Sequence, residues 1–181
     1  MKVCARCFNL YFALIAAVML AGGCKTSDHD KNNKVVAALR VHIQVNPDNA
    51  GDLSTSETVS VLRDDPVSVT IAKEPVLTEA NIIAARIINA PGGFAVEVQF
   101  DESGGLVLEQ YSAANPGNHF AIFGQWGDKL SNGRWLAAPL ITHAISNGDL
   151  SFTPDMSRAE ADQLVLGLNN VAKKINKGSL K

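Results

Sequence analysis

The chain has 181 residues, enough for one domain with a sizeable core and a targeting segment. An apolar fraction of 46% and a charged fraction of 19% are typical of a folded domain and exclude a wholly disordered chain. The formal net charge of −2 becomes −4 without residues 1–23, because Lys2 and Arg6 are lost and the first acidic residue is Asp28. Nucleic acid requires a basic face, so this balance argues against a nucleic-acid partner.

Residues 1–24 have the three parts of an export signal. A basic start precedes an apolar run over residues 8–20, which is too short to span a bilayer as a mature helix. The next five residues, Leu20-Ala21-Gly22-Gly23-Cys24, resemble the lipobox of bacterial lipoproteins, although Ala21 stands where the commonest form has leucine. We therefore predict a lipoprotein signal peptide over residues 1–23 and lipidation of Cys24. The alternatives are a secretory signal cut after Gly23 and an uncleaved amphipathic anchor.

All three cysteines, Cys4, Cys7 and Cys24, fall in the first 24 residues, so no disulfide can form inside the domain. Residues 25–34 are polar and lack apolar periodicity, which predicts that residues 24–34 are a lipidated flexible tether. The first predicted partner is thus a membrane, bound through the lipid on Cys24. The predicted location is the bacterial cell envelope, with the domain on the non-cytoplasmic side of the inner or the outer membrane.

The first half of the predicted domain, which spans residues 35–175, is rich in short strands. Leu39, Val41 and Ile43 share one face of the first of them. Thr78 is a plausible N-cap of a short helix, and the residues that follow it, 84–90, either end that helix or begin a strand. The predicted strands of this half cover residues 35–45, 58–62 and 67–72.

The second half begins with the clearest strand, residues 94–100, and ends with the clearest helix. Ser157 and Glu160 form a capping box at the start of an amphipathic helix that runs to residue 175, followed by a tail over residues 176–181. Asn147-Gly148 is the strongest hairpin signal in the chain. The other predicted elements are a helix over 106–114 and strands over 120–126, 135–146 and 149–153.

Short connections and alternating strands argue for an antiparallel β-sheet with about three helices packed mainly on one of its faces. The predicted fold class is therefore α+β, in a single domain.

An ordered set of short motifs resembles the head subdomain of the first periplasmic domain of SecD, an accessory subunit of protein export. The resemblance covers residues 73–170. The motifs are Pro75-Val76-Leu77-Thr78-Glu79-Ala80-Asn81-Ile82, Phe94-Ala95-Val96-Glu97-Val98-Gln99-Phe100-Asp101 with Gly104-Gly105, Phe120-Ala121-Ile122-Phe123, Leu136-Ala137-Ala138-Pro139-Leu140-Ile141, and Phe152-Thr153-Pro154-Asp155 with Glu160-Ala161 and Leu168.

The resemblance implies a head module that contacts an exported polypeptide or a component of the export machinery. SecD itself carries several transmembrane helices and uses the proton gradient. Only a signal segment is present in this sequence, so the resemblance does not imply the motor function.

Three aromatic residues around residues 124–134 are the candidate partner-binding residues: Phe123, Trp126 and Trp135. Strand alternation places Phe123 on one face and Trp126 on the other, so at most one of these two faces lines a helix-covered core. The alternative interpretation is that both tryptophans cap the edge of the core.

Nothing in the sequence indicates catalysis. The four histidines are scattered, and phosphate-loop, nucleophile-elbow and metal-ligand spacings are all missing. We predict no catalytic, cofactor-binding or metal-binding residues, and a non-catalytic protein-binding or export-associated role. The alternatives are a structural envelope lipoprotein without a protein client and an envelope enzyme.

Overall fold

The computed structural model describes residues 35–46 and 55–178, so the predicted signal peptide, Cys24 and the tether lie outside the described residues. Two α-helices, two 3₁₀ turns and nine strands occur in the described part. They are β1 (Ala38–Ile43), β2 (Ser56–Val61), β3 (Val67–Ala72), β4 (Leu77–Thr78), η2 (Glu79–Asn81), β5 (Ile82–Ala90), β6 (Gly93–Phe100), α3 (Glu102–Ala114), β7 (Phe120–Trp126), η3 (Asp128–Leu130), β8 (Asn132–Ala137), β9 (Asp149–Phe152) and α4 (Arg158–Gly178).

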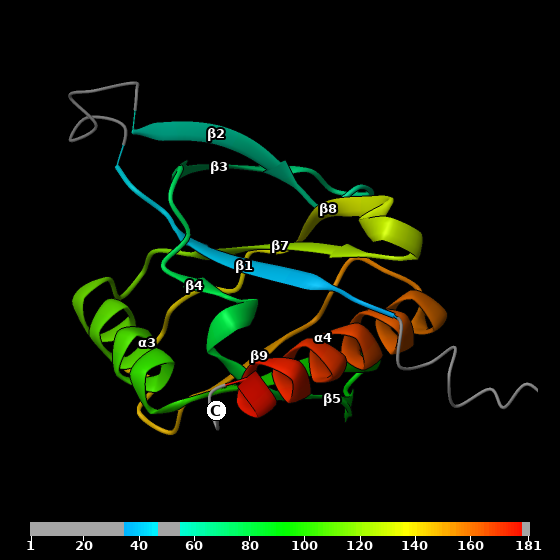
Figure 1. Ribbon diagram of the computed structural model, residues 1–181. Coiled ribbons are helices and arrows are strands. Elements are labelled where there is room, and N and C mark those ends of the chain that lie inside the picture. Colours follow the sequence, from blue (N-terminus) through cyan, green and yellow to red (C-terminus); the bar gives the residue numbers. More distant parts are fainter. Residues whose placement is uncertain (1–34, 47–54, 179–181) are drawn as a thin grey trace, which may run out of the picture. The chain divides into compact units, whose positions relative to one another are not determined.

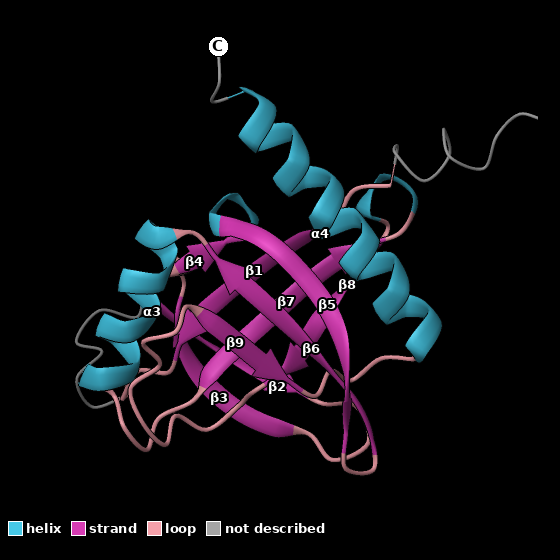
Figure 2. Ribbon diagram, turned by 90° about the horizontal axis from the view of Figure 1, so that it is seen from below, coloured by secondary structure: helices cyan, strands magenta, loops and turns pink. Residues whose placement is uncertain are grey.

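The strands form three antiparallel sheets instead of the one sheet that the sequence predicts. The first has four strands in the order β4-β1-β7-β8, and the second has three in the order β5-β6-β9. The third is a two-stranded ribbon of β2 and β3, which lies above β1 and β7 in Figure 1. Figure 2 shows α3 and α4 at opposite sides of the strands, so the helices do not share one face.

Alternating apolar residues build the main core between the four-stranded sheet, the three-stranded sheet and α4. Leu39, Val41 and Ile43 of β1 are buried, as their shared strand face predicts. On α4 the buried stripe includes Leu164 and Leu168. Removing each such side chain from water contributes about 1.5–3 kcal/mol of favourable free energy, so this core dominates the stability of the domain.

A second, smaller core lies under the ribbon, on the other face of the four-stranded sheet. The buried residues of the ribbon there come from its inward positions, because strand residues alternate between faces. The cluster consists of Val61, Val69, Ile71 and Ala121, with Val59, Trp135 and Ala138 packed against it.

Both helices begin at polar caps. The Asp101 side chain accepts a hydrogen bond from the Gly104 backbone at 2.7 Å, so α3 starts at Glu102, earlier than the predicted residue 106. At α4 the Glu160 backbone donates to the Ser157 hydroxyl at 3.3 Å and the Ser157 backbone donates to Glu160 at 2.8 Å. These bonds confirm the predicted capping box.

The prediction of about three helices is wrong. Thr78 does accept a cap hydrogen bond, from the Ala80 backbone at 3.3 Å, but it caps only the 3₁₀ turn η2. Ile82 then adopts extended dihedrals (φ −86°, ψ 128°) and begins β5, which pairs with β6 along its length. Residues 84–90 are therefore strand, because pairing with β6 and the isoleucines of this segment favour the extended form.

The predicted strand over residues 135–146 and the predicted hairpin at Asn147-Gly148 are also wrong. Strand β8 ends at Ala137, and Pro139 follows, a residue that cannot donate a ladder hydrogen bond. Gly148 keeps the left-handed dihedral of a turn (φ 74°), but β9 after it pairs with β6 and not with β8. The segment between them therefore carries the chain from one sheet to the other.

Candidate functional site

The two tryptophans lie on opposite faces of the four-stranded sheet. Trp126 is fully buried in the main core, where the Arg134 guanidinium stacks 4.9 Å from its ring centre. Trp135 is half-buried on the opposite face, and its ring meets that of its cross-strand partner Phe123 edge to face at 5.2 Å. Of the three candidate partner-binding residues, Phe123 and Trp135 are therefore partly exposed, and Trp126 lies in the core.

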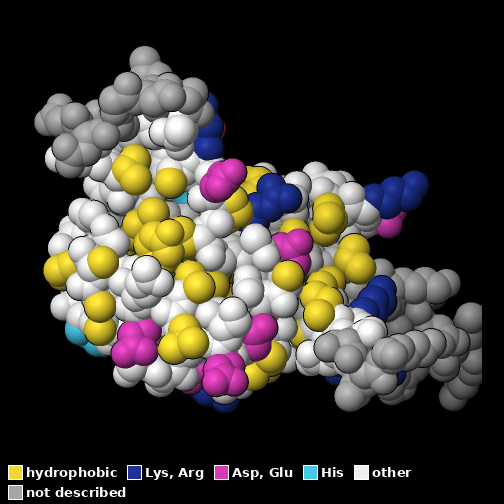
Figure 3. Space-filling view, turned by 60° about the vertical axis from the view of Figure 1, so that its left-hand side comes forward, with side chains coloured by type: hydrophobic (Ala, Val, Ile, Leu, Met, Phe, Trp, Pro, Cys, Tyr) yellow, Lys and Arg dark blue, Asp and Glu magenta, His cyan; other side chains and the backbone are white. Residues whose placement is uncertain are grey.

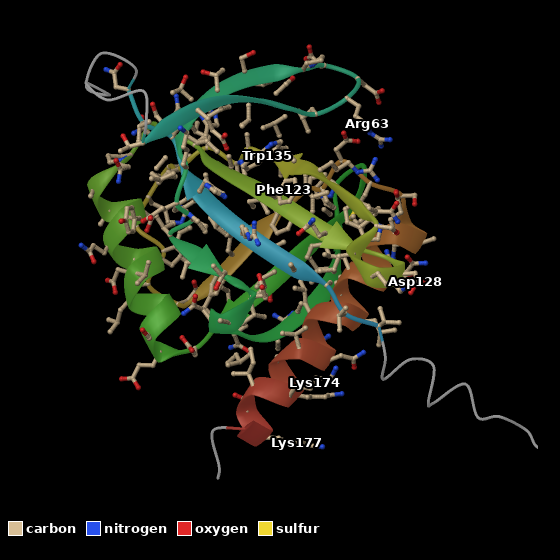
Figure 4. The ribbon with its side chains drawn as sticks, turned by 45° about the horizontal axis from the view of Figure 1, so that its top comes forward. Arg63, Phe123, Asp128, Trp135, Lys174 and Lys177 are labelled. Atoms are coloured by element: carbon tan, nitrogen blue, oxygen red, sulfur yellow. The ribbon has the colours of Figure 1, made fainter. Side chains whose placement is uncertain are left out.

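Trp135 also joins the sheet to the ribbon. Its ring contacts that of His42 at 5.2 Å, and the His42 Nδ1 lies 2.8 Å from the carbonyl oxygen of Ala72 in β3. Figure 4 shows Phe123 and Trp135 between the ribbon and the sheet. The aromatic pair therefore helps to support one end of the ribbon.

The other end of the ribbon is attached by an ion pair. The Arg63 guanidinium and backbone N–H all donate to the Asp155 carboxylate, over distances of 2.8–3.1 Å. The Arg63 hydrogen bonds, opposed by some burial, hold the pKa of Asp155 below its usual value. The same hydrogen bonds raise the pKa of Arg63. We call this contact the ribbon latch.

A second ion pair, between Arg134 and Glu160, lies beside the latch at the start of α4. Burial alone would raise the pKa of Glu160. The hydrogen bonds from Ser157 and the positive charge of Arg134 have the larger combined effect, so the pKa of Glu160 is lowered. Both carboxylates therefore stay ionised at neutral pH and hold β8 and the ribbon turn against the helix start.

A hollow of about 480 Å³ opens beside the ribbon turn. Residues of the turn, of the end of β8 and of β9 line it, and most of them are apolar: Leu62, Ala137, Ala138, Pro139, Phe152 and Thr153. A second hollow of about 460 Å³ shares Pro139 and Ser151 with the first and continues along the other end of β9, past the 53% exposed Leu140. We call the two hollows together the β9 groove.

Strand β9 is an edge strand toward this groove. Within the described residues it pairs only with β6. The Phe100 backbone donates to the Gly148 carbonyl at 2.9 Å, which makes Leu150 and Phe152 the residues whose backbone groups point to β6. The backbone N–H and C=O of Ser151 consequently point the other way, toward the groove.

Sequence reasoning missed the β9 groove, because it placed residues 135–146 and 149–153 in one hairpin. Pro139 was the available signal, since proline rarely lies inside a paired strand. It indicates that the regular ladder is interrupted after Ala137, and beyond this point an isolated bridge joins His119 to Leu140. Among the described residues, no group of three or more His, Cys, Asp or Glu could hold a metal ion.

In fold and site, the domain is an α+β module with an apolar groove along an exposed strand edge. The family model for the SecDF P1 head subdomain matches residues 56–172, and the chain belongs to this family. The resemblance predicted from residues 73–170 is thus confirmed. No curated protein matches the sequence.

Two solved structures have the same fold. A structure of SecDF, described as a membrane component that enhances protein export, is 21% identical, with a TM-score of 0.51 over 82% of this chain and 70% of that chain. SecDF in its super-membrane-facing form is 21% identical, with a TM-score of 0.52 over 82% of this chain and 21% of that chain. This chain thus spans about a fifth of that SecDF chain. Neither helix of the described residues has the length and apolar character needed to cross a membrane.

Proposed function

We propose that this protein is a cell-envelope lipoprotein whose domain binds extended segments of exported polypeptides in the β9 groove. Membership of the SecDF P1 head family supports an export-associated role on the non-cytoplasmic side of the membrane. The similar SecDF, which enhances protein export, supports a polypeptide as the ligand class.

The observation that carries this proposal is the unpaired edge of β9 beside an apolar hollow. An extended polypeptide supplies backbone donors and acceptors at strand spacing, which matches the outward N–H and C=O of Ser151. Alternate side chains of such a ligand would enter the hollow lined by Ala138, Pro139 and Phe152. Recognition through the backbone accepts many sequences, as a module for varied exported chains requires.

Binding of a defined peptide tests the groove. The probe is a fluorescent ten-residue peptide of alternating valine and threonine, measured by anisotropy against the purified protein. Its affinity should fall about tenfold when alternate peptide amides are N-methylated, because a backbone hydrogen bond contributes about 1–1.5 kcal/mol. Equal affinity of the methylated and unmethylated peptides would contradict strand pairing.

Matched surface variants locate the binding site. Leu140→Asp places a charge in the groove and should weaken binding, whereas Leu106→Asp, on α3 at 63% exposure and outside the groove lining, should leave it unchanged. Phe123→Ala tests the predicted aromatic site in the same assay. If Phe123→Ala weakens binding and Leu140→Asp does not, the ligand binds at the Phe123–Trp135 pair instead.

The anchor has its own test. We propose the domain organisation predicted from the sequence, with residues 1–23 as the signal peptide, residues 24–34 as the tether and an acylated Cys24. Two or more acyl chains anchor a protein stably, since each buried methylene contributes about 0.8 kcal/mol. Growth with an alkyne-tagged fatty acid should label the wild type and not Cys24→Ala. Labelling of both forms, or of neither, would contradict the lipid anchor.

A further inference from the structure

We propose that the C-terminal end of α4 docks on an anionic membrane surface and so orients the domain. This inference rests on the proposed lipid anchor at Cys24, and it concerns which side of the domain faces the lipid. The docking surface, which we call the basic end, consists of Lys173, Lys174 and Lys177.

The basic end extends beyond the packed part of the helix. The buried stripe of α4 reaches Ala172, and each residue from Lys173 to Gly178 is exposed. Ile175 continues the line of the stripe but is 40% exposed, so its apolar side chain has no core to cover. Figure 4 shows Lys174 and Lys177 pointing outward from this end.

The charge on the basic end is of one sign. Residues 163–178 contain three lysines and no acidic residue, and the lysines form none of the ion pairs found among the described residues. The acidic residues of α4, Glu160 and Asp162, lie in its first turns, so the helix is polarised along its length.

The elements beside α4 offset this charge only in part. The turn η2 contacts the helix and carries Glu79, whose side chain is half-buried with Oε2 shielded from solvent. On the face shown in Figure 3, in contrast, charged side chains of both signs lie among hydrophobic ones. The basic end is thus the surface suited to a layer of negative charge.

The start of the described chain places this end near the proposed anchor. The Asn170 side chain donates to the Val35 carbonyl at 3.0 Å, one turn before the basic end. A Cβ on Gly167 would lie 2.6 Å from that of Ala37, so the segment just before β1 and the helix are in close contact here. Only residues 25–34 separate Val35 from Cys24, which limits their separation to about 40 Å.

These observations favour one occupant, a bilayer that contains anionic lipid. An anionic leaflet attracts each nearby lysine, and the attraction decays within the Debye length of about 8 Å at physiological salt. The described chain starts about one helical turn from the basic end, so a tether from this point lets the basic end reach the bilayer surface.

The test uses the lipidated protein in vesicles, with a fluorescent label at Asn176→Cys. The domain has no other cysteine and acylation blocks Cys24, so the label is specific. In vesicles with 30% phosphatidylglycerol, a lipid-borne quencher should reduce the fluorescence at least twofold more than in phosphatidylcholine vesicles. The excess should disappear in the variant with Lys173, Lys174 and Lys177 all changed to Gln, whose melting temperature should stay close to that of the wild type.

Two controls make the result specific. A label at Ser68→Cys, on the exposed side of the ribbon, should report no lipid contact. Lys174→Gln should reduce the excess quenching, and Lys129→Gln, which removes an exposed lysine from η3, should not. Equal quenching in both lipids, equal effects of these two variants, or stronger quenching at Ser68→Cys would overturn the proposal. If the protein purified from membranes carries no acyl group and does not bind vesicles, the lipid anchor at Cys24 is refuted instead of the docking surface.

Discussion

Trp126 and Trp135 flank the same turn, yet they belong to two different parts of the domain. Trp126 is fully buried beneath α4, in a core that two sheets and a helix enclose. Trp135 is half-buried in the smaller cluster, which only the β2–β3 ribbon covers. The helix contacts the sheets along most of its length, whereas the ribbon covers only the smaller cluster and is also attached near both of its ends.

The strands β7 and β8 therefore contribute to two cores, one on each face of their sheet, and these cores differ in how much they stabilise the domain. The main core combines many large buried side chains, so it sets the global stability. The ribbon has few buried residues and depends partly on an exposed ion pair, so it is expected to open locally without global unfolding. Four substitutions test this contrast.

Trp126→Ala should have the largest effect. The change removes the largest fully buried side chain, and the cavity left behind should lower the free energy of unfolding by about 3–5 kcal/mol. Denaturant unfolding followed by circular dichroism measures it, with Trp126→Phe as a milder control. A loss below about 1 kcal/mol would mean that the main core does not depend on this residue.

Gly167→Ala should have the next largest effect, because the added methyl group would push α4 away from the segment just before β1. The added Cβ would lie 2.6–2.7 Å from atoms of Val36 and Ala37, and overpacking of this kind costs about 1–3 kcal/mol. Gly105→Ala in α3 is the matched control, since its Cβ would meet only an ordinary contact at 3.5 Å. The control should be neutral or stabilising by up to about 1 kcal/mol in the same unfolding measurement. Equal destabilisation by both would refute the close contact.

Trp135→Ala should destabilise less than Trp126→Ala, by about 1–2 kcal/mol, because its ring is only half-buried. Its distinctive effect should be local. Amide hydrogen exchange should accelerate in β2 and β3, which lose their aromatic support, and stay slow in β5 and β6. Uniform acceleration across the domain would show that the ribbon and the main core unfold together.

The ribbon latch should have the smallest effect and should depend on pH. The pKa of Asp155 is lowered in the folded state, so its contribution to stability is present above the unfolded pKa and is lost as the pH falls through the folded value. The ribbon resonances in NMR spectra should therefore be constant from about pH 5 to 8 and shift below about pH 4. Asp155→Asn should abolish the acid shift near Arg63, and Glu160→Gln should retain it. A ribbon shift at neutral pH would contradict the latch.

Part of this architecture was predictable from local pattern. Alternation in residues 39–43 and 94–100, the Ser157–Glu160 capping box and the stripe of α4 each depend on neighbours a few positions apart. The ordered motifs over residues 73–170 also indicated the SecDF P1 head family, which the match over residues 56–172 confirms. The family and the strongest elements were thus readable without coordinates.

The candidate site was less accessible to sequence reasoning. Asn147-Gly148 has the local chemistry of a hairpin, but strand pairing is decided by which edge the chain reaches. Alternation places Phe123 and Trp126 on opposite faces of their strand, but the ribbon that covers the face of Phe123 is attached through a contact between Arg63 and Asp155. These residues are far apart in the chain, so no periodicity relates them.

The sequence by itself determined the fold class, the family and which residues of β7 lie on each of its two faces, because side-chain direction follows from local backbone geometry. Only the tertiary structure decided that β9 pairs with β6, that a ribbon closes the second core, and that a groove lies along the free edge of β9. These features arise from contacts between distant segments. Their free energies depend on which surfaces meet, and a local pattern does not specify that.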